Sequence, residues 1–247
     1  MDTSRSSFSP RNRLLAALPF DSLARLRPML EEVEMPIRRV LHEPEIPIST
    51  VYFPESGWAS MLATMEDGDA TEVGLVGFEG VVGLPVILAD EFDDLEAVVQ
   101  AAGTAFAVSA VALRQAMDED PILRDLLLRY ALVHHGQVAR TAACNGRHQT
   151  EQRLARWLLM AHDRSEGDGF PMTHEFLAMM LGVRRAGVTV AAGALQRAQF
   201  IRYERGHVEV MDRPGLESAA CECYGVARRA SDRLFKPERS ARAVYRR

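Results

Sequence analysis

The 247-residue sequence contains no run of about 18 apolar residues, the length that a single membrane-spanning helix needs. Its polar start, residues 1–13, also lacks the apolar core of a secretion signal. We therefore expect a cytoplasmic protein with no membrane partner. Cysteine is scarce as well: Cys144, Cys221 and Cys223 are too few and too unevenly placed for a disulfide framework, so we expect reduced thiols.

Positive charge is scarce in the first part of the chain. Residues 1–146 hold 11 basic and 22 acidic residues, whereas residues 147–247 hold 18 and 12. Residues 228–247 alone contribute 8 basic and 2 acidic residues, and we interpret this segment as a mobile basic tail. Without that tail the second part is neutral, so its affinity for nucleic acid must depend on where the arginines lie.

The composition, 47% hydrophobic and 26% charged, is that of a globular protein with room for two modest domains. Leucines at helical spacing within residues 12–34 predict two short helices that cover one end of a sheet. Short apolar runs broken by turn residues follow over residues 40–108, including a hairpin signal at Asp67-Gly68. This pattern is typical of an antiparallel roll or jelly roll. A glycine-rich bend interrupts the pattern at residues 77–85.

A long helix is predicted from Pro121 to Cys144, stopped by Asn145-Gly146. Apolar or small residues recur along it at spacings of 4 and 3, as in a coiled-coil seam. The members of this predicted seam are Leu127, Ala131, His134 and Val138, followed by Thr141. A second apolar face, through Leu126, Tyr130 and Val133, leaves one face for the roll and one for a partner. The alternative is a helix buried within its own domain.

Residues 173–181 predict a short amphipathic helix, with Thr173 as its N-cap. Ala178, Gly182 and Val188 then follow at the separations of a helix-turn-helix: a small residue where helices cross, a glycine free to turn, and a branched plug. In the second helix an apolar stripe faces inward, which leaves the opposite residues facing outward. The outward residues are Arg185, Ala186, Thr189, Val190 and Gly193.

The flanking segments complete a winged domain. Residues 150–164 predict a helix before it, residues 165–169 a polar loop, and residues 200–205 and 207–211 the two strands of a wing around Gly206. Residues 216–224 predict a closing helix that carries Cys221 and Cys223.

The string from Thr173 to Leu195 with Phe200-Ile201 resembles the DNA-binding domain of the Crp/Fnr family of bacterial transcription regulators. Tyr52-Phe53-Pro54, Gly57 and residues 77–84 resemble the cyclic-nucleotide-binding-like sensor domain of that family. The resemblance implies an α+β fold with an N-terminal antiparallel β-roll, or jelly-roll, sensor domain (12–118). A dimerisation helix (119–146), a C-terminal winged helix-turn-helix domain (147–227) and the basic tail (228–247) follow.

As a function, the resemblance implies a homodimer that binds double-stranded DNA at a palindromic operator with half-sites about one turn apart. Arg185 falls on a base-reading position, and Thr173 and His174 fall on phosphate-contacting positions. Arg184, Thr189 and Val190 complete the predicted interface. Ala186 stands where many members have a base-reading glutamate and Val190 where they have a second arginine, so we expect a different operator sequence. RNA polymerase and an unidentified small-molecule effector are the further partners that we expect.

The effector pocket departs from the family pattern. Nucleotide-binding members hold the ribose with a Gly-Glu pair and the phosphate with an Arg and a small hydroxyl residue. Here Gly83-Leu84 and Leu95-Glu96 align with those pairs, and no lysine or arginine occurs between Arg39 and Arg114. A buried phosphate needs such a group or a nest of N–H groups. Glu79, in the same bend, has two interpretations: it meets a ligand, or, as we prefer, it accepts from turn amides.

Metal and cofactor chemistry has weak support in the sequence, and we expect no metal and no cofactor. No cysteine precedes Cys144, whereas an iron–sulfur cluster needs about four thiolates. His134 or His42 could serve as a haem ligand, but we prefer ordinary exposed or capping histidines. The Cys221-x-Cys223 pair has no second pair for zinc, and we favour structural or incidental thiols.

Two other classes of function remain open. An enzyme is not expected, because no His, Cys or carboxylate cluster has motif spacing, and Cys144 and His148 are only a lone pair four residues apart. The other alternative is a ligand-binding regulatory module that acts through protein contacts. Such a module would show no salt-dependent DNA binding.

Titration of the purified protein with cyclic AMP and cyclic GMP in a calorimeter tests the departure at the pocket. We expect no binding at micromolar nucleotide, because the residues that would hold the ribose and phosphate are missing. A saturable isotherm would contradict this expectation and would require a phosphate site elsewhere.

Overall fold

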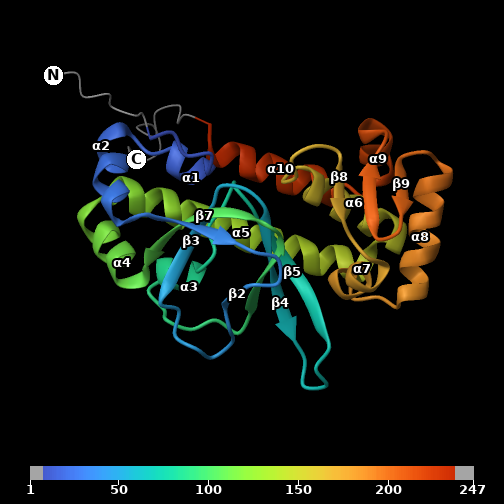
Figure 1. Cartoon of the computed structure of the whole chain (residues 1–247), viewed down its shortest axis with the longest axis horizontal. Helices are drawn as coiled ribbons and strands as arrows, with labels where there is room; N and C mark the ends of the chain where they lie inside the picture. Colours follow the sequence, from blue (N-terminus) through green and yellow to red (C-terminus); the bar gives the residue numbers. More distant parts are fainter. Residues whose placement is uncertain (1–7, 237–247) are drawn as a thin grey trace, which may run out of the picture.

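The computed structural model describes residues 8–236, which form an α+β chain with a β-roll at one end and a helical domain at the other (Figure 1). The first part contains α1 (Arg13–Ala16), α2 (Phe20–Leu26), a 3-10 turn (Arg27–Met29), β1 (Glu31–Met35), β2 (Val40–His42), β3 (Thr50–Pro54), β4 (Trp58–Thr64), β5 (Ala70–Val76), α3 (Leu84–Ile87), β6 (Glu96–Ala101), β7 (Gly103–Ser109) and α4 (Ala110–Glu119). The second contains α5 (Pro121–Arg147), α6 (Thr150–His162), β8 (Gly169–Pro171), α7 (His174–Leu181), α8 (Arg185–Arg197), β9 (Ile201–Glu204), β10 (His207–Val210), α9 (Arg213–Ala219) and α10 (Cys223–Leu234).

The roll consists of two antiparallel sheets, with strand orders β1-β7-β3 and β2-β6-β4-β5. The predicted α+β class with an antiparallel roll, a long helix and a C-terminal helix-turn-helix is therefore confirmed. The last part of the pattern predicted over residues 40–108 contains two strands, β6 and β7, which are separated at Ala102 and pair in different sheets. The segment 31–35 is a strand, which the leucine spacing of residues 12–34 did not predict.

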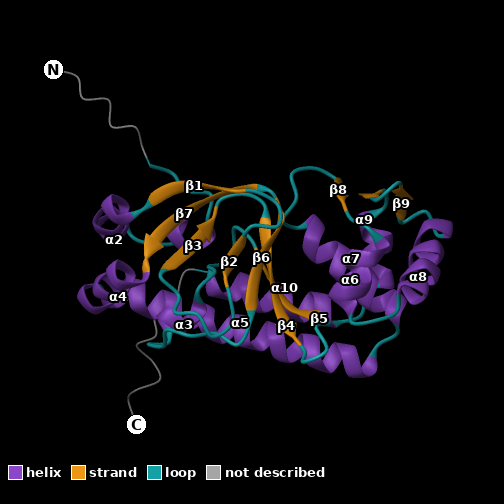
Figure 2. Cartoon of the chain, turned by 60° about the horizontal axis from the view of Figure 1, so that its bottom comes forward, coloured by secondary structure: helices purple, strands orange, loops and turns teal. Residues whose placement is uncertain are grey.

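The long helix α5 runs beneath the roll and on toward the helical domain (Figure 2). Asp120 caps its start, since its Oδ1 accepts from the N–H groups of Ile122 and Leu123 at 3.0 and 3.3 Å. Pro121 stands at the first position, where a helix needs no N–H donor. The helix continues through Asn145 and Gly146, which were expected to end it, and stops at Arg147.

The predicted seam of α5 lies on a face that the chain itself covers. Leu127 is fully buried, Ala131 and His134 are 6% and 8% exposed, and a Cβ on Gly74 of β5 would lie 3.4 Å from the His134 ring. One residue further round the helix, Leu128 and Leu132 are 40% and 71% exposed. The exposed series continues at the same spacings through His135, Ala139 and Ala142. The residues predicted for the seam therefore pack within the chain, and the neighbouring series is exposed. Which of the two faces meets a partner stays a prediction.

The C-terminal segment returns to the roll, so the first part of the predicted basic tail is a helix. Figures 1 and 2 both show α10 lying along α5, against which it packs. Leu234 at its end is buried in the cluster that also holds Leu14 and Leu26, and its carbonyl accepts from Arg129 Nη2 at 3.1 Å. The Arg13 guanidinium lies 4.1 Å from the centre of the Phe235 ring. Residues 237–247 of the predicted tail lie outside the described residues.

The expected closing helix over residues 216–224 is also wrong in its bounds. The segment divides into the end of α9 and the start of α10, with Cys221 between the two helices.

No single helix among residues 8–236 is long and apolar enough to cross a membrane; α7 and α8 reach that length and composition only as a pair bent by 106°.

The two ends of the molecule share one apolar core. Trp58, Leu62 and Leu75 of the roll belong to the same buried cluster as residues of α6, α7 and α8. The Trp58 ring meets that of Phe170 edge-on, with 6.1 Å between centroids. An ion pair also joins the two parts: Arg164 Nη2 lies 2.5 Å from Glu79 Oε1.

A buried carboxyl lies within this contact. Glu72 of β5 is 4% exposed, and its Oε1 accepts from the indole N–H of Trp157 on α6 at 2.7 Å. The Ser60 hydroxyl donates to its Oε2. Burial raises the pKa of Glu72 from its ordinary value of 4.5 to about 8, so the folded protein holds this proton at neutral pH.

This raised pKa predicts a pH-dependent stability. The unfolded chain releases the Glu72 proton near pH 4.5, whereas the folded chain keeps it up to about pH 8. Between these two values the folded state binds more protons, so the free energy of unfolding falls as pH rises. The limiting slope is about 1.4 kcal/mol per pH unit. Glu72→Gln keeps both hydrogen bonds without a titrating group and should flatten the profile of melting temperature against pH.

Glu66→Gln, at an exposed acid of the same hairpin, is the control and should retain the wild-type profile. Equal slopes for wild type and Glu72→Gln would contradict the assignment.

Candidate nucleic-acid interface

The helices α7 and α8 form a helix-turn-helix whose turn is set by a cap and a glycine. The Oγ1 of Thr173 accepts from the N–H of Phe176 at 3.2 Å and so caps α7, as predicted. Gly182 ends α7 with φ 58°, a left-handed conformation that glycine adopts without strain. The bend of 106° between the two helices lies within the range of about 90–120° of such motifs.

The two faces of α8 separate as the apolar spacing predicts. Val188, Ala191, Ala192 and Leu195 are buried in the shared core. Arg184, Arg185, Ala186 and Thr189 are exposed, and Val190 is 71% exposed despite its apolar side chain.

A network of polar and aromatic contacts holds α8 against α7 and the wing. The Nδ1 of His174 lies 3.1 Å from Thr189 Oγ1, and this hydroxyl also contacts the carbonyl of Arg185 at 3.1 Å. The ring of Tyr203 on β9 stacks on His174 with 4.3 Å between centroids. Tyr203 was not among the predicted site residues, because a single tyrosine in a strand pattern carries no positional signal.

The two ring nitrogens of His174 have different surroundings. Its Nδ1 is engaged by Thr189 and its Nε2 is buried without a hydrogen-bond partner among the described residues. Burial, followed by the charge of Arg185, lowers the pKa of His174, so the ring is neutral at neutral pH. His174 thus holds Thr189 of α8, and its predicted contact with a phosphate stays a prediction.

Positive charge surrounds the exposed face of α8. Arg184 and Arg185 lie at its start, Arg197 at its end and Arg205 in the wing turn, all exposed. Arg185 Nη1 is 3.6 Å from Glu175 Oε2, but these side chains are 68% and 79% exposed, so the pair is weak and easily replaced by an anion.

The wing is a hairpin of β9 and β10. Arg205 and Gly206 join the strands with φ values of 49° and 77°, the left-handed pair of a tight two-residue turn. β8 pairs with β10 and adds a third strand. This strand was not predicted, since it begins at the end of the polar loop expected over residues 165–169. Its three residues are too few to show an alternating pattern.

The five predicted effector-pocket residues do not share one cavity among the described residues. Gly83 caps α3 with φ 107°, and Leu84 packs against the core below α1 and α2. Leu95 packs on the inner faces of the roll, and Glu96 lies in a groove between the roll and α7. Glu79 lines a different cavity.

That cavity, of about 310 Å³, lies where the roll, α5, α6 and α10 meet. Glu79 lines this cavity and accepts from the N–H of Gly77 at 3.2 Å, which agrees with the role at turn amides that we preferred. The same carboxylate also forms the ion pair with Arg164. His134 also lines it, and burial lowers the pKa of this histidine to about 4.

Comparison with known families places residues 152–219 in the Crp-like helix-turn-helix domain. FixK2 from Bradyrhizobium japonicum has a similar structure, with a TM-score of 0.68 at 16% identity over 78% of this chain and 98% of that chain. The chain has the fold of a Crp/Fnr transcription regulator.

Two regulators from Thermus thermophilus have the same Crp/Fnr fold. TTHA1359, of the CRP/FNR family, gives a TM-score of 0.63 at 22% identity, covering 77% of this chain and 98% of that one. TTHB099, of the CRP family, gives 0.62 at 20%, covering 76% and 96%. Curated protein sequences gave no match. The helix-turn-helix that matches the Crp-like family model is thus attached to a roll and a long helix, and both are also part of the Crp/Fnr fold.

Proposed function

We propose that this chain is a homodimeric, sequence-specific transcription regulator that inserts α8 into the major groove of a palindromic operator. The observation that carries the proposal is the exposed face of α8, where Arg184, Arg185, Thr189 and Val190 project from a helix whose opposite face is fixed in the core. A rigid helix with an exposed polar face is what direct reading of base edges requires.

Each exposed side chain suits a distinct contact. Arg185 can donate two hydrogen bonds to a guanine edge once it leaves Glu175, and Val190 can contact a thymine methyl group. Arg184, before the first turn of α8, suits a phosphate, as do Arg197 and Arg205 at the edges of the face. The Thr173 hydroxyl, which accepts as a cap, still has its proton to donate to a phosphate.

A second copy of the chain is the partner that we propose for the exposed face of α5. Leu128, Leu132, His135, Ala139 and Ala142 follow one another at spacings of 4, 3, 4 and 3, the pattern of a two-helix seam. Two recognition helices related by a two-fold axis then require inverted half-sites about one turn of DNA apart. RNA polymerase and a small-molecule effector remain the further partners proposed.

The alternative, a regulatory module that acts through protein contacts, has one supporting observation: α7 and β5 are in close contact, so the helix-turn-helix already serves as a protein-binding surface within the chain. Selection of bound sequences from a random DNA pool at two salt concentrations separates the two functions. An enriched palindrome bound more weakly at high salt supports the regulator, and no enrichment supports the module.

Arg185→Ala and Arg184→Ala, titrated on the selected operator and on scrambled DNA, test the reading of bases. Loss of a two-bond contact to guanine should reduce the preference of Arg185→Ala for the operator by about 1–3 kcal/mol. Arg184→Ala is the matched control and should weaken both DNAs alike, with a salt dependence lower by about one charge. Equal losses on both DNAs for Arg185→Ala would show that Arg185 does not read a base.

Light scattering of the purified protein tests the dimer. We expect a dimer without added ligand, and Leu132→Glu should give a monomer because it places a charge in an apolar seam. Val111→Glu is the control: Val111 is 79% exposed on α4, away from the seam, and this variant should stay dimeric. A monomeric wild type at micromolar concentration, or a dimeric Leu132→Glu, would contradict the proposed face.

A further inference from the structure

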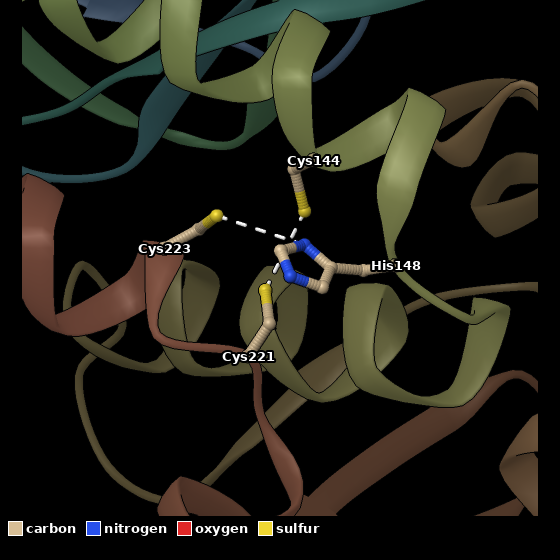
Figure 3. Close-up of side chains that lie close together, drawn as sticks. All are labelled: Cys144, His148, Cys221 and Cys223. Carbon is tan, nitrogen blue, oxygen red and sulfur yellow. Dashed lines mark hydrogen bonds between the residues drawn. The ribbon is translucent and has the colours of Figure 1, made fainter.

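Two segments that are distant in sequence bring all three cysteines of the chain to one histidine (Figure 3). Cys144 lies in the last turn of α5, His148 just after that helix, Cys221 between α9 and α10, and Cys223 at the start of α10. The three thiols are buried and form a cluster apart from the larger apolar cores. The sequence shows two weak pairs, Cys144 with His148 and Cys221 with Cys223, and the fold places them together.

The spacing of the four donor atoms suits one tetrahedral metal ion. Bonds of about 2.3 Å to sulfur and about 2.0–2.1 Å to nitrogen place tetrahedral donors about 3.5–3.8 Å apart. The Sγ atoms of Cys144 and Cys221 are 3.5 Å apart, and Cys223 Sγ is 3.7 Å from His148 Nδ1. All four donor atoms lie within 4.8 Å of one another, so shifts of about 1 Å complete the geometry.

The histidine is oriented as a metal ligand requires. Its Nδ1 faces the thiols, while its Nε2 lies 3.3 Å from Glu222 Oε2. A carboxylate on the second ring nitrogen fixes the tautomer that leaves the first nitrogen free to bind a metal, and such pairs accompany most metal-binding histidines. Glu222 stands between the two cysteines of the Cys-x-Cys pair, so one short segment supplies two thiols and this carboxylate.

Two buried positive charges, those of Arg153 and Arg156, lie near the cluster. They are 8% and 6% exposed. Arg153 Nη2 donates to the Leu181 carbonyl and Arg156 Nη2 to Thr141 Oγ1 at 3.0 Å, and among residues 8–236 neither guanidinium forms an ion pair with a carboxylate. Buried guanidinium groups need a nearby negative charge, which metal-bound thiolates supply.

We propose that Cys144, His148, Cys221 and Cys223 bind one zinc-type divalent ion in a tetrahedral site. Four protein ligands leave no position for substrate, so the site is structural. The ion joins the end of α5 to the α9–α10 connection, which fixes the helical domain on the long helix. This site replaces the expectation of incidental thiols, and it does not depend on DNA binding.

Metal content and cobalt spectroscopy of the purified, reduced chain test the site. We expect one zinc per chain by elemental analysis after dialysis. Cobalt in place of zinc should give the strong visible bands of a tetrahedral ion and thiolate-to-cobalt charge transfer. Zinc should protect the three thiols from alkylation, and a chelator should expose them and lower the melting temperature, which zinc but not magnesium restores.

Variants that leave the buried thiols in place keep the test independent of folding. Glu222→Gln should weaken zinc affinity about 10- to 100-fold. His148→Ala should weaken it further, whereas His148→Cys should retain one zinc with a more thiolate-like cobalt spectrum. His207→Ala, at an exposed histidine of β10, is the matched control and should bind zinc like wild type.

Three results would overturn the proposal. They are a wild-type protein that binds no zinc and gives an octahedral cobalt spectrum, iron with acid-labile sulfide in place of zinc, and a Cys144–Cys221 disulfide in protein kept reduced during purification.

Discussion

Burial of the β4–β5 hairpin against α6, α7 and α8 is the interaction on which the arrangement of the molecule depends. The contact contains the apolar residues Trp58, Leu62 and Leu75. It also contains two polar interactions, the hydrogen bond from Trp157 to the Glu72 carboxyl and the ion pair of Glu79 with Arg164. Apolar area supplies the stabilisation, and buried polar groups fix one geometry because any other leaves them without partners. The direction in which α8 faces follows from that geometry.

Much of this architecture follows from local pattern. The stripes of α6 and α8, the Thr173 cap, the Gly182 turn and the Asp67-Gly68 hairpin each depend on residues a few positions apart, so the sequence alone predicts them. The exposed face of α8, with Arg184, Arg185, Thr189 and Val190, follows from the same periodicity.

Features that depend on long-range packing were missed or misplaced. Two adjacent faces of α5 carry nearly the same apolar spacing, so only packing against the core of the roll shows that Leu127 is internal and Leu128 external. The arginines of α10 gave residues 228–236 the composition of a tail, although Leu234 has a place in the roll core. The cysteine cluster spans 77 residues between Cys144 and Cys221, a separation at which no motif spacing applies.

The anchoring of α10 has a mechanical consequence. The helix starts in the helical domain, ends with Leu234 in the core of the roll, and so ties the two parts at both ends. A large rotation of the helical domain must withdraw that leucine, which costs about 1.5–3 kcal/mol, or roughly a ten- to hundredfold change in the ratio of two conformations. Any molecule that reorients α8 must bind the reoriented form more tightly by at least that ratio, whatever its overall affinity.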